Sequence, residues 1–304
     1  MFEMEEEMLA QQNMLMLMMD PPRHTRYRLL VSRAFTPRNI RALEEYIDRT
    51  ATEIVDNVIE RGECDFVTDF AMRLPTEIFL TLLGVPNSDA DLFVPWVEDF
   101  FAGFGGDLDQ QETMGAALVA IRQYWVDVLE ARRGETQRRE NDFVSDLVHS
   151  TVDGEPLGDD LILDILTVLV LAGLDTTRGQ LGYLFRHLAD HPDDRHRLIG
   201  EPGLIPSAVE ESLRLYTIIF GDGRIVAQDT DFHGCPLNKG DMVYGLVSGA
   251  NRDPRVYDRP DEFIVDRKAN NHLGFAGGPH RCLGAHLARM VMQVDEARHH
   301  HGKE

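Results

Sequence analysis

The sequence predicts a mainly α-helical protein with a small β portion, and three observations support this. Apolar side chains recur at helical spacing along most of the 304 residues. Alternation typical of strands is confined to residues 224–232 and 242–247, with Gly234 turning the chain between them. Hydrophobic residues make up 43% of the chain, which is globular composition, and the sequence has no repeat or low-complexity segment. We therefore expect a single domain over residues 1–304.

The first half of the chain is predicted to form four amphipathic helices. The run at residues 20–22 contains two prolines and favours a helix start, and Thr36 followed by proline favours its end. Gly84, with Pro86 two residues later, favours another helix end. The four helices are expected at residues 23–35, 38–61, 70–83 and around 118–129.

The longest helix is predicted from Asp159 to about Asp190, where His191 and Pro192 end it. It is apolar on most sides, so we expect it to cross the middle of the molecule. The charged segment before it, residues 132–142, is expected to be an exposed loop. The last helix is expected to begin near Cys282.

Charge and cysteine content exclude several classes of protein. The 30 Lys and Arg residues against 52 Asp and Glu give a formal charge of −22, which repels phosphate backbones and anionic lipids. Asp164 interrupts the richest apolar run, and the amino terminus is acidic where a secretory signal is basic. The cysteines are too few for a disulfide framework: Cys64, Cys235 and Cys282. We predict a cytoplasmic protein that binds neither nucleic acid nor membrane.

A glycine-rich loop near the carboxyl end carries the strongest chemical signal. Its spacing is Phe-x-x-Gly-x-x-x-Cys-x-Gly, formed by Phe275, Gly278, Cys282 and Gly284. Glycines let the backbone fold tightly around one sulfur, and N–H groups at a following helix start stabilise a thiolate. Phe275 suits packing against a large flat cofactor. The alternative is a buried structural cysteine in a glycine turn.

This loop resembles the haem-ligand loop of bacterial cytochromes P-450, which are haem-thiolate monooxygenases, and the resemblance runs from about Asp20 to Arg289. It implies the P-450-type fold, here incomplete, with haem b as cofactor and Cys282 as the axial iron ligand. Such a thiolate pushes electron density into the iron and favours O–O cleavage. Ala276 stands where the family usually has glycine, a change expected to tighten the loop.

A second motif, at residues 172–177 in the long helix, resembles the family's oxygen-binding groove. Here the resemblance implies that Ala172 and Gly173 contact the cofactor, and glycine is expected to open space for dioxygen. The Thr176 hydroxyl is expected to bond back to the helix carbonyls and loosen the helix. By resemblance, Asp175 and Thr176 are the catalytic acid–alcohol pair that delivers protons. The alternative is a buried helix with a polar notch.

Charged residues elsewhere match the family in order. Glu211 and Arg214 have the spacing of its Glu-x-x-Arg motif, which serves in a buried ion network with a third basic residue. Glu262 stands where many relatives have that arginine, and Arg267 is the nearest substitute. The haem propionates need cations, and the alternative for each is a solvated surface charge. By resemblance, the propionate contacts are His24, Arg28, Arg224 and His280.

The implied activity inserts one atom of O2 into a small organic substrate. Electrons are expected from NAD(P)H through a ferredoxin reductase and a ferredoxin, because the chain shows no flavin or nicotinamide motif and residues 103–106 lack the third dinucleotide-loop glycine. Four basic residues are expected to form a patch that docks an acidic ferredoxin: Arg23, Arg26, Arg281 and Arg289. The alternative is that these are scattered surface charges. The alternatives are a truncated, non-catalytic haem-binding protein and a peroxide-driven peroxygenase.

Two histidine groups and the two chain ends complete the expectations. His187 and His191 are four apart and could share a metal, although a surface position is favoured. Residues 299–301 are three histidines expected in a frayed tail. Only 19 residues precede Asp20, and little follows the last helix, so the resemblance implies truncation at both ends. The chain as given is therefore expected to bind haem weakly, aggregate and turn over poorly.

Overall fold

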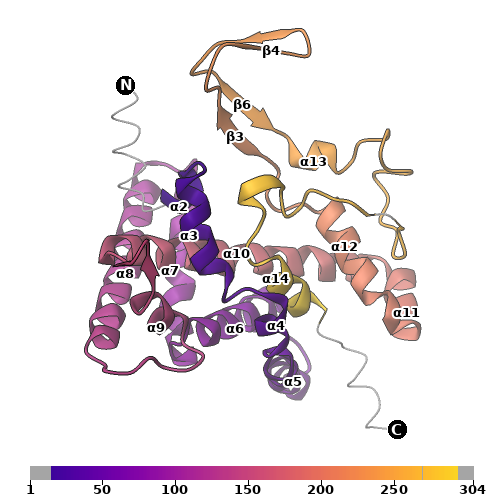
Figure 1. Cartoon of the computed structure of the whole chain (residues 1–304). Coiled ribbons are helices and arrows are strands. Elements are labelled where there is room, and N and C mark those ends of the chain that lie inside the picture. Colours follow the sequence, from indigo (N-terminus) through magenta and orange to yellow (C-terminus); the bar gives the residue numbers. More distant parts are fainter. Residues whose placement is uncertain (1–14, 269, 294–304) are drawn as a thin grey trace. The chain divides into compact units, whose positions relative to one another are not determined.

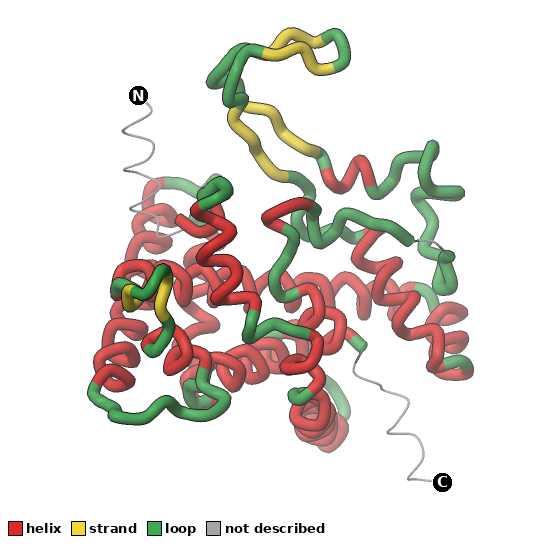
Figure 2. Tube along the Cα trace, viewed as in Figure 1, coloured by secondary structure: helices red, strands yellow, loops and turns green. Residues whose placement is uncertain are grey.

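The computed structural model describes residues 15–268 and 270–293. Helices dominate this part of the chain, and the strands are short (Figure 1, Figure 2). The described strands pair into three antiparallel two-stranded sheets: β1 (Thr151–Val152) with β2 (Glu155–Pro156), β3 (Asp222–Ile225) with β6 (Met242–Gly245), and β4 (Thr230–Phe232) with β5 (Cys235–Leu237). The predicted fold class, mainly α with a small β portion, is confirmed. The histidines at 299–301 and the acidic amino terminus lie outside the described residues.

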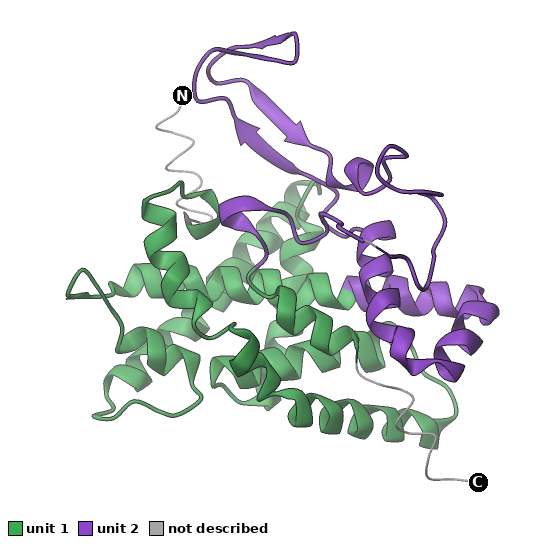
Figure 3. Ribbon diagram, turned by 45° about the vertical axis from the view of Figure 1, so that its right-hand side comes forward, with its two compact units in different colours: residues 1–178, 283–294 green, residues 179–282, 295–304 purple. Residues whose placement is uncertain are grey.

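The chain divides into two compact units (Figure 3). In the described part, unit 1 comprises residues 15–178 and 283–293, and unit 2 comprises residues 179–268 and 270–282. The boundary between residues 178 and 179 falls inside the long helix α10 (Asp159–Asp190). The expectation of a single domain remains a prediction.

Unit 1 is almost entirely helical. The predicted first helix stops at Ser32, and the predicted helix at 38–61 is two helices because Ala42 and Leu43 separate them. The helices α7 (Ala90–Ala102) and α9 (Phe143–Val148) were not among the predicted ones. Besides the first part of α10, the elements are α2 (Leu15–Met18), α3 (Arg23–Ser32), α4 (Pro37–Arg41), α5 (Glu44–Arg61), η1 (Val67–Ala71, a π-helical turn), α6 (Arg73–Leu83), η2 (Asn87–Asp89), α7 (Ala90–Ala102), α8 (Leu108–Arg133), α9 (Phe143–Val148), β1 (Thr151–Val152), β2 (Glu155–Pro156) and α14 (Ala285–Met292).

The core of unit 1 forms around α7 and α8, which pack along each other. Trp125 of α8 is fully buried, and its ring centroid lies 5.5 Å from that of Phe93 on α7. The predicted helix end at Gly84 is confirmed, since this residue has φ 84° and caps α6. Arg132 and Asp142 differ from the expected exposed loop, because both are buried and form an ion pair of 2.7 Å. Arg132 also donates to the Gly84 carbonyl at 2.8 Å, which ties three helices together.

Unit 2 combines the rest of α10 with short helices and two β-hairpins. The predicted strand at 224–232 is two strands, which pair with different partners. The predicted turn at Gly234 is confirmed, with φ 86°. The elements are α11 (Pro192–Gly200), η3 (Pro202–Leu204), α12 (Ile205–Leu215), β3 (Asp222–Ile225), β4 (Thr230–Phe232), β5 (Cys235–Leu237), β6 (Met242–Gly245), α13 (Val247–Ala250) and η4 (Gly278–His280).

Helix α10 has the predicted bounds, from Asp159 to Asp190. All ten residues from Ile162 to Leu171 are buried: eight are apolar, and the other two are the polar Asp164 and Thr167. Arg122 of α8 pairs with Asp164 at 3.0 Å, so the one carboxylate in this run is compensated. Within the described residues, no helix is both long and apolar enough to cross a membrane.

Candidate active site

The cysteine loop is a series of tight turns in unit 2. The Ala276 N–H donates to the Leu273 carbonyl at 2.7 Å, and the Cys282 N–H donates to the Phe275 carbonyl at 2.9 Å. Between them, Gly278 has φ 68° and begins the short helix η4. The backbone hydrogen bond between residues 275 and 282 closes the loop, so the position of Cys282 is set by backbone contacts.

The surroundings of Cys282 fit a flat cofactor held by one sulfur. This cysteine is exposed and forms no disulfide, contrary to the alternative of a buried structural cysteine. A Cβ added at Gly277 or Gly278 would meet nothing within 4 Å, so within unit 2 the loop is uncovered at these two glycines. Among the described residues no group of three His, Cys, Asp or Glu side chains can hold a bare metal ion. A single exposed thiol suits an iron whose other ligands come from a porphyrin.

Ala276 stands where the family usually has glycine, and its backbone conformation is strained. Its φ is 54°, which lies in the left-handed region that favours glycine. An alanine Cβ at such an angle approaches the carbonyl oxygen and costs about 1–2 kcal/mol. The substitution therefore strains the loop at the turn that begins with Leu273.

The oxygen-groove motif lies in the unit 1 part of α10. The Thr176 hydroxyl donates to the Ala172 carbonyl at 2.8 Å, as predicted. The helix nevertheless stays α-helical through these residues, so the expected loosening is not observed. Ala172 is exposed, whereas Leu171 and Leu174 beside it are only 3% exposed. The buried helix therefore has an uncovered spot at Ala172 and Thr176 within unit 1.

Gly173 does not open space in the way we expected. A Cβ there would lie 2.7 Å from the Phe79 ring of α6, and Phe79 is itself buried. Close packing against this ring, rather than an empty volume, accounts for glycine at this position. Its role toward the cofactor remains a prediction, and the uncovered spot is at Ala172.

Asp175 is held by an arginine on its own helix. Arg178 donates to Asp175 and also pairs with Glu98 of α7 at 2.8 Å, so it bridges two carboxylates. The Asp175 side chain is only partly exposed. Asp175 and Thr176 therefore engage different partners, Arg178 and the Ala172 carbonyl. The acid–alcohol relay remains a prediction.

The four predicted propionate residues fall into both units. In unit 1, His24 is 2% exposed on α3 and Arg28 is partly buried one turn later, so His24 is not a solvated surface charge. In unit 2, Arg224 lies on β3, pairs with Asp222 at 2.7 Å and keeps 60% of its side chain exposed. His280 lies in η4 beside Cys282 in sequence. Gly284, the N-cap of α14, belongs to unit 1.

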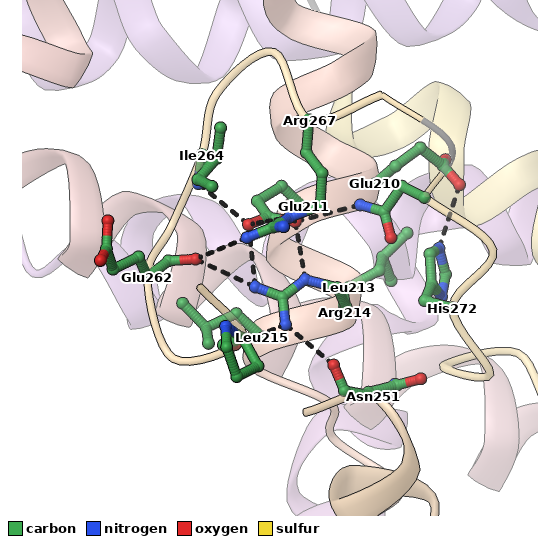
Figure 4. Close-up of polar contacts among 12 residues, drawn as sticks. Glu210, Glu211, Leu213, Arg214, Leu215, Asn251, Glu262, Ile264, Arg267 and His272 are labelled. Carbon is green, nitrogen blue, oxygen red and sulfur yellow. Dashed lines mark hydrogen bonds and ion pairs between the residues drawn. The ribbon is translucent and has the colours of Figure 1, made fainter. Parts of the chain in front are cut away.

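The predicted ion network is present and complete in unit 2 (Figure 4). Glu211 and Arg214 are fully buried and pair at 2.8 Å. Arg267 donates from Nε to both Glu211 oxygens at 2.9 Å, which confirms it as the third member. Glu262 contributes its backbone carbonyl to both arginines, while its carboxylate pairs with Arg259 at the surface. Glu262 therefore contributes to the network through its backbone carbonyl and not through its side chain.

Sequence reasoning missed other buried residues of unit 2. His187 is 5% exposed, so the favoured surface position was wrong; it contacts the Tyr216 hydroxyl at 2.7 Å and Asp194 at 2.9 Å. Burial lowers the pKa of His187, and the charge of His191 lowers it further, while the hydrogen bond that His187 makes to Asp194 opposes this. His272, which precedes the cysteine loop, was also missed. Its position three residues before Phe275 was the available signal.

Comparison with known proteins identifies the class. The model of the family "Cytochrome P450" matches residues 203–295. The Steroid C26-monooxygenase of Mycobacterium tuberculosis (strain CDC 1551 / Oshkosh) is 36% identical over 284 residues, covering 92% of this chain and 75% of that protein. The Mycinamicin IV hydroxylase/epoxidase of Micromonospora griseorubida is 36% identical over 282 residues, covering 92% of this chain and 70% of that protein.

Solved structures agree with this class. P450BioI in complex with an acyl carrier protein bearing hexadec-9Z-enoic acid superposes with a TM-score of 0.88 at 30% identity, covering 95% of this chain and 74% of that one. The polyketide-synthase cytochrome P450 PksS of Bacillus subtilis 168 superposes with a TM-score of 0.84 at 32% identity, covering 92% of this chain and 71% of that one. The fold and the cysteine loop define a haem-thiolate monooxygenase. The chain belongs to the cytochrome P450 family.

Family membership establishes the cofactor and the type of enzyme. The protein is a cytochrome P450 monooxygenase that uses haem b, with reducing equivalents from NAD(P)H delivered by partner proteins. It acts on small organic substrates with such redox partners.

Proposed function

We propose that the protein binds haem b through the Cys282 thiolate and inserts one oxygen atom from O2 into a small organic substrate. The observation that carries this is the exposed Cys282 at the end of a glycine loop, with its backbone N–H fixed by Phe275 at 2.9 Å. When bound, the haem supplies the activation of O2. The 36% identity to relatives named as a monooxygenase and a hydroxylase/epoxidase supports the reaction type.

We assign the remaining haem contacts to eight further residues. The cations for the haem propionates are His24, Arg28, Arg224 and His280. The apolar contacts are Ala172, Gly173, Phe275 and Gly284. The burial of His24 supports its assignment, because a buried imidazole has been withdrawn from water and gains from an anionic partner.

Asp175 and Thr176 are assigned to proton delivery. The Thr176 hydroxyl donates to the Ala172 carbonyl at 2.8 Å, so it passes its proton on only after leaving this acceptor. The Asp175 carboxylate is paired with Arg178, and release of this pairing frees it to bond to a water molecule. Arg178 keeps Glu98 as a second partner, which lowers the cost of releasing Asp175.

We assign electron supply to a ferredoxin and its reductase. In unit 1, helices α4 and α14 pack together, and Arg38 and Arg41 of α4 are exposed. Neither forms an ion pair within the described part of the chain, which leaves their charge available for an acidic partner. Of the predicted docking residues, Arg26 pairs with Asp153 and Arg289 lies on α14.

The three cysteines form no disulfide, which supports a cytoplasmic location.

The test measures product against NAD(P)H consumed. Purified holoprotein is titrated with candidate substrates, including a steroid and mycinamicin IV, until one changes the haem spin state. That substrate is then supplied with NAD(P)H, ferredoxin and reductase, or with hydrogen peroxide alone. Product that requires NAD(P)H and the partners supports the proposal. Product with peroxide alone indicates a peroxygenase, and no product by either route indicates a non-catalytic haem-binding protein; either result contradicts the proposal.

A further inference from the structure

His272 stands at the base of the cysteine loop and is almost completely buried, with 2% of its side chain exposed. Both ring nitrogens have partners. The Gly274 N–H donates to Nδ1 at 3.0 Å, and Nε2 lies 3.0 Å from a carboxylate oxygen of Glu210 on α12 (Figure 4). A backbone N–H can only donate, so Nδ1 is the unprotonated nitrogen and Nε2 carries the proton that it donates to Glu210. The two contacts fix the tautomer and the plane of the ring.

The loop backbone is pressed against α12 at the same place. A Cβ at Gly274 would lie 2.8 Å from the Leu213 carbonyl and 3.0 Å from His272 Nδ1, so only glycine fits there. The next residue is also held, because the Leu273 N–H donates to the Asn251 side chain at 2.7 Å. Two consecutive backbone N–H groups are thus bound by side chains from outside the loop.

These contacts continue to Cys282 through the backbone. The Leu273 carbonyl accepts the Ala276 N–H, and the Phe275 carbonyl accepts the Cys282 N–H. The carboxylates of α12 are divided between two tasks: Glu211 joins the buried ion network, while its neighbour Glu210 anchors His272. Both ring nitrogens of the buried His272 are hydrogen-bonded at the base of this loop. We therefore expect the loss of this side chain to affect the loop.

We propose that His272, anchored by Glu210, is a positioning residue that holds the base of the ligand loop so that the Cys282 sulfur faces the iron. The proposal rests on the proposed function, since it requires Cys282 to be the ligand. His272 itself touches no reacting atom. Partners that orient a metal ligand typically change metal affinity 10- to 100-fold when removed, so a comparable effect on haem retention is expected.

The chain offers a graded series of variants. His272→Phe keeps a ring but removes both contacts. His272→Asn keeps the local contact, because an asparagine side-chain oxygen accepts from the N–H two residues later in an Asx turn, but it loses Glu210. Glu210→Ala removes the anchor of His272, and the Glu210 side chain is 26% exposed. His196→Phe, an exposed histidine on α11, is the matched control.

Two readouts on the holoprotein test the proposal without measuring turnover: the rate of haem transfer to apomyoglobin, and the fraction of the ferrous–CO complex with the red-shifted Soret band of thiolate ligation. We expect transfer about tenfold faster and a reduced thiolate fraction in His272→Phe, smaller changes of the same kind in His272→Asn and Glu210→Ala, and wild-type values in His196→Phe.

Wild-type values of both readouts in His272→Phe overturn the proposal. If His272→Phe does not fold by circular dichroism, Glu210→Ala decides, and wild-type values there overturn it equally. Failure of the proposed function gives a different result: Cys282→Ser would then keep the red-shifted band, whatever the histidine variants do.

Discussion

Arg267 should contribute strongly to the stability of the buried ion network. The perturbation is Arg267→Met, which keeps a long side chain but removes the guanidinium. In the structure, Nε donates to both oxygens of Glu211, and the two terminal nitrogens donate to the carbonyls of Asp258, Arg259 and Glu262. The Arg267 side chain is only 7% exposed and that of Glu211 is fully buried, so water cannot replace these contacts cheaply.

The expected loss follows from this geometry. Removing one partner of a buried ion pair costs about 3–5 kcal/mol, because the remaining charge stays buried. In the variant Glu211 keeps its ion pair with Arg214, so we expect a loss of stability near the lower end of this range. The matched control is Arg259→Met, whose pairs with Glu262 and Asp258 leave its side chain 55% exposed. Such a surface pair contributes at most about 1 kcal/mol.

Urea unfolding followed by circular dichroism provides the assay, with excess haem in every sample so that the cofactor contributes equally. We expect a clearly lower midpoint for Arg267→Met than for Arg259→Met. Glu262→Arg should not restore it, since the Glu262 side chain points to Arg259 at the surface. Equal midpoints for the two methionine variants, or recovery in Arg267→Met with Glu262→Arg, would refute the role of Arg267.

Three further predictions concern the loop and the long helix. Ala276→Gly should raise stability by about 0.5–1 kcal/mol in thermal unfolding, because glycine relieves the positive φ; a lower melting temperature would contradict the strain. Gly173→Ala should cost about 1–3 kcal/mol through the clash with Phe79, whereas Gly182→Ala on the same helix, with open space around it, should be neutral or stabilising; equal melting temperatures would refute the packing argument. Thr176→Ala should keep the ferrous–CO spectrum but form less product and more peroxide per NAD(P)H; unchanged coupling would exclude its role.

Local sequence signals predicted the fold class and the cysteine loop. The bounds of α10 followed from an apolar helical pattern that ends at His191 and Pro192. The loop at residues 275–282 followed from the fixed spacing of its glycines and cysteine. Both signals act over a few neighbouring residues, so periodicity and motif spacing were sufficient.

Contacts between distant segments could not be predicted in this way. The break at Ala42 and Leu43 lies in a pattern that remains helical in the sequence. The Phe79 ring against Gly173 and the contact of Tyr216 with His187 join residues that are far apart along the chain. Periodicity gives the face of a helix, but it does not identify what packs on that face. The burial of His187 was therefore missed, and the proposed roles of His24 and Arg224 rest on the resemblance.

The central claim is that Cys282 supplies the thiolate that holds the haem iron. The most direct measurement is the difference spectrum of the reduced protein with and without CO, recorded for three single variants. Cys282→Ser should lose the red-shifted Soret band of thiolate-ligated haem, while Cys64→Ser and Cys235→Ser should keep it. A red-shifted band that persists in Cys282→Ser, or that disappears in either of the other two variants, would contradict the account.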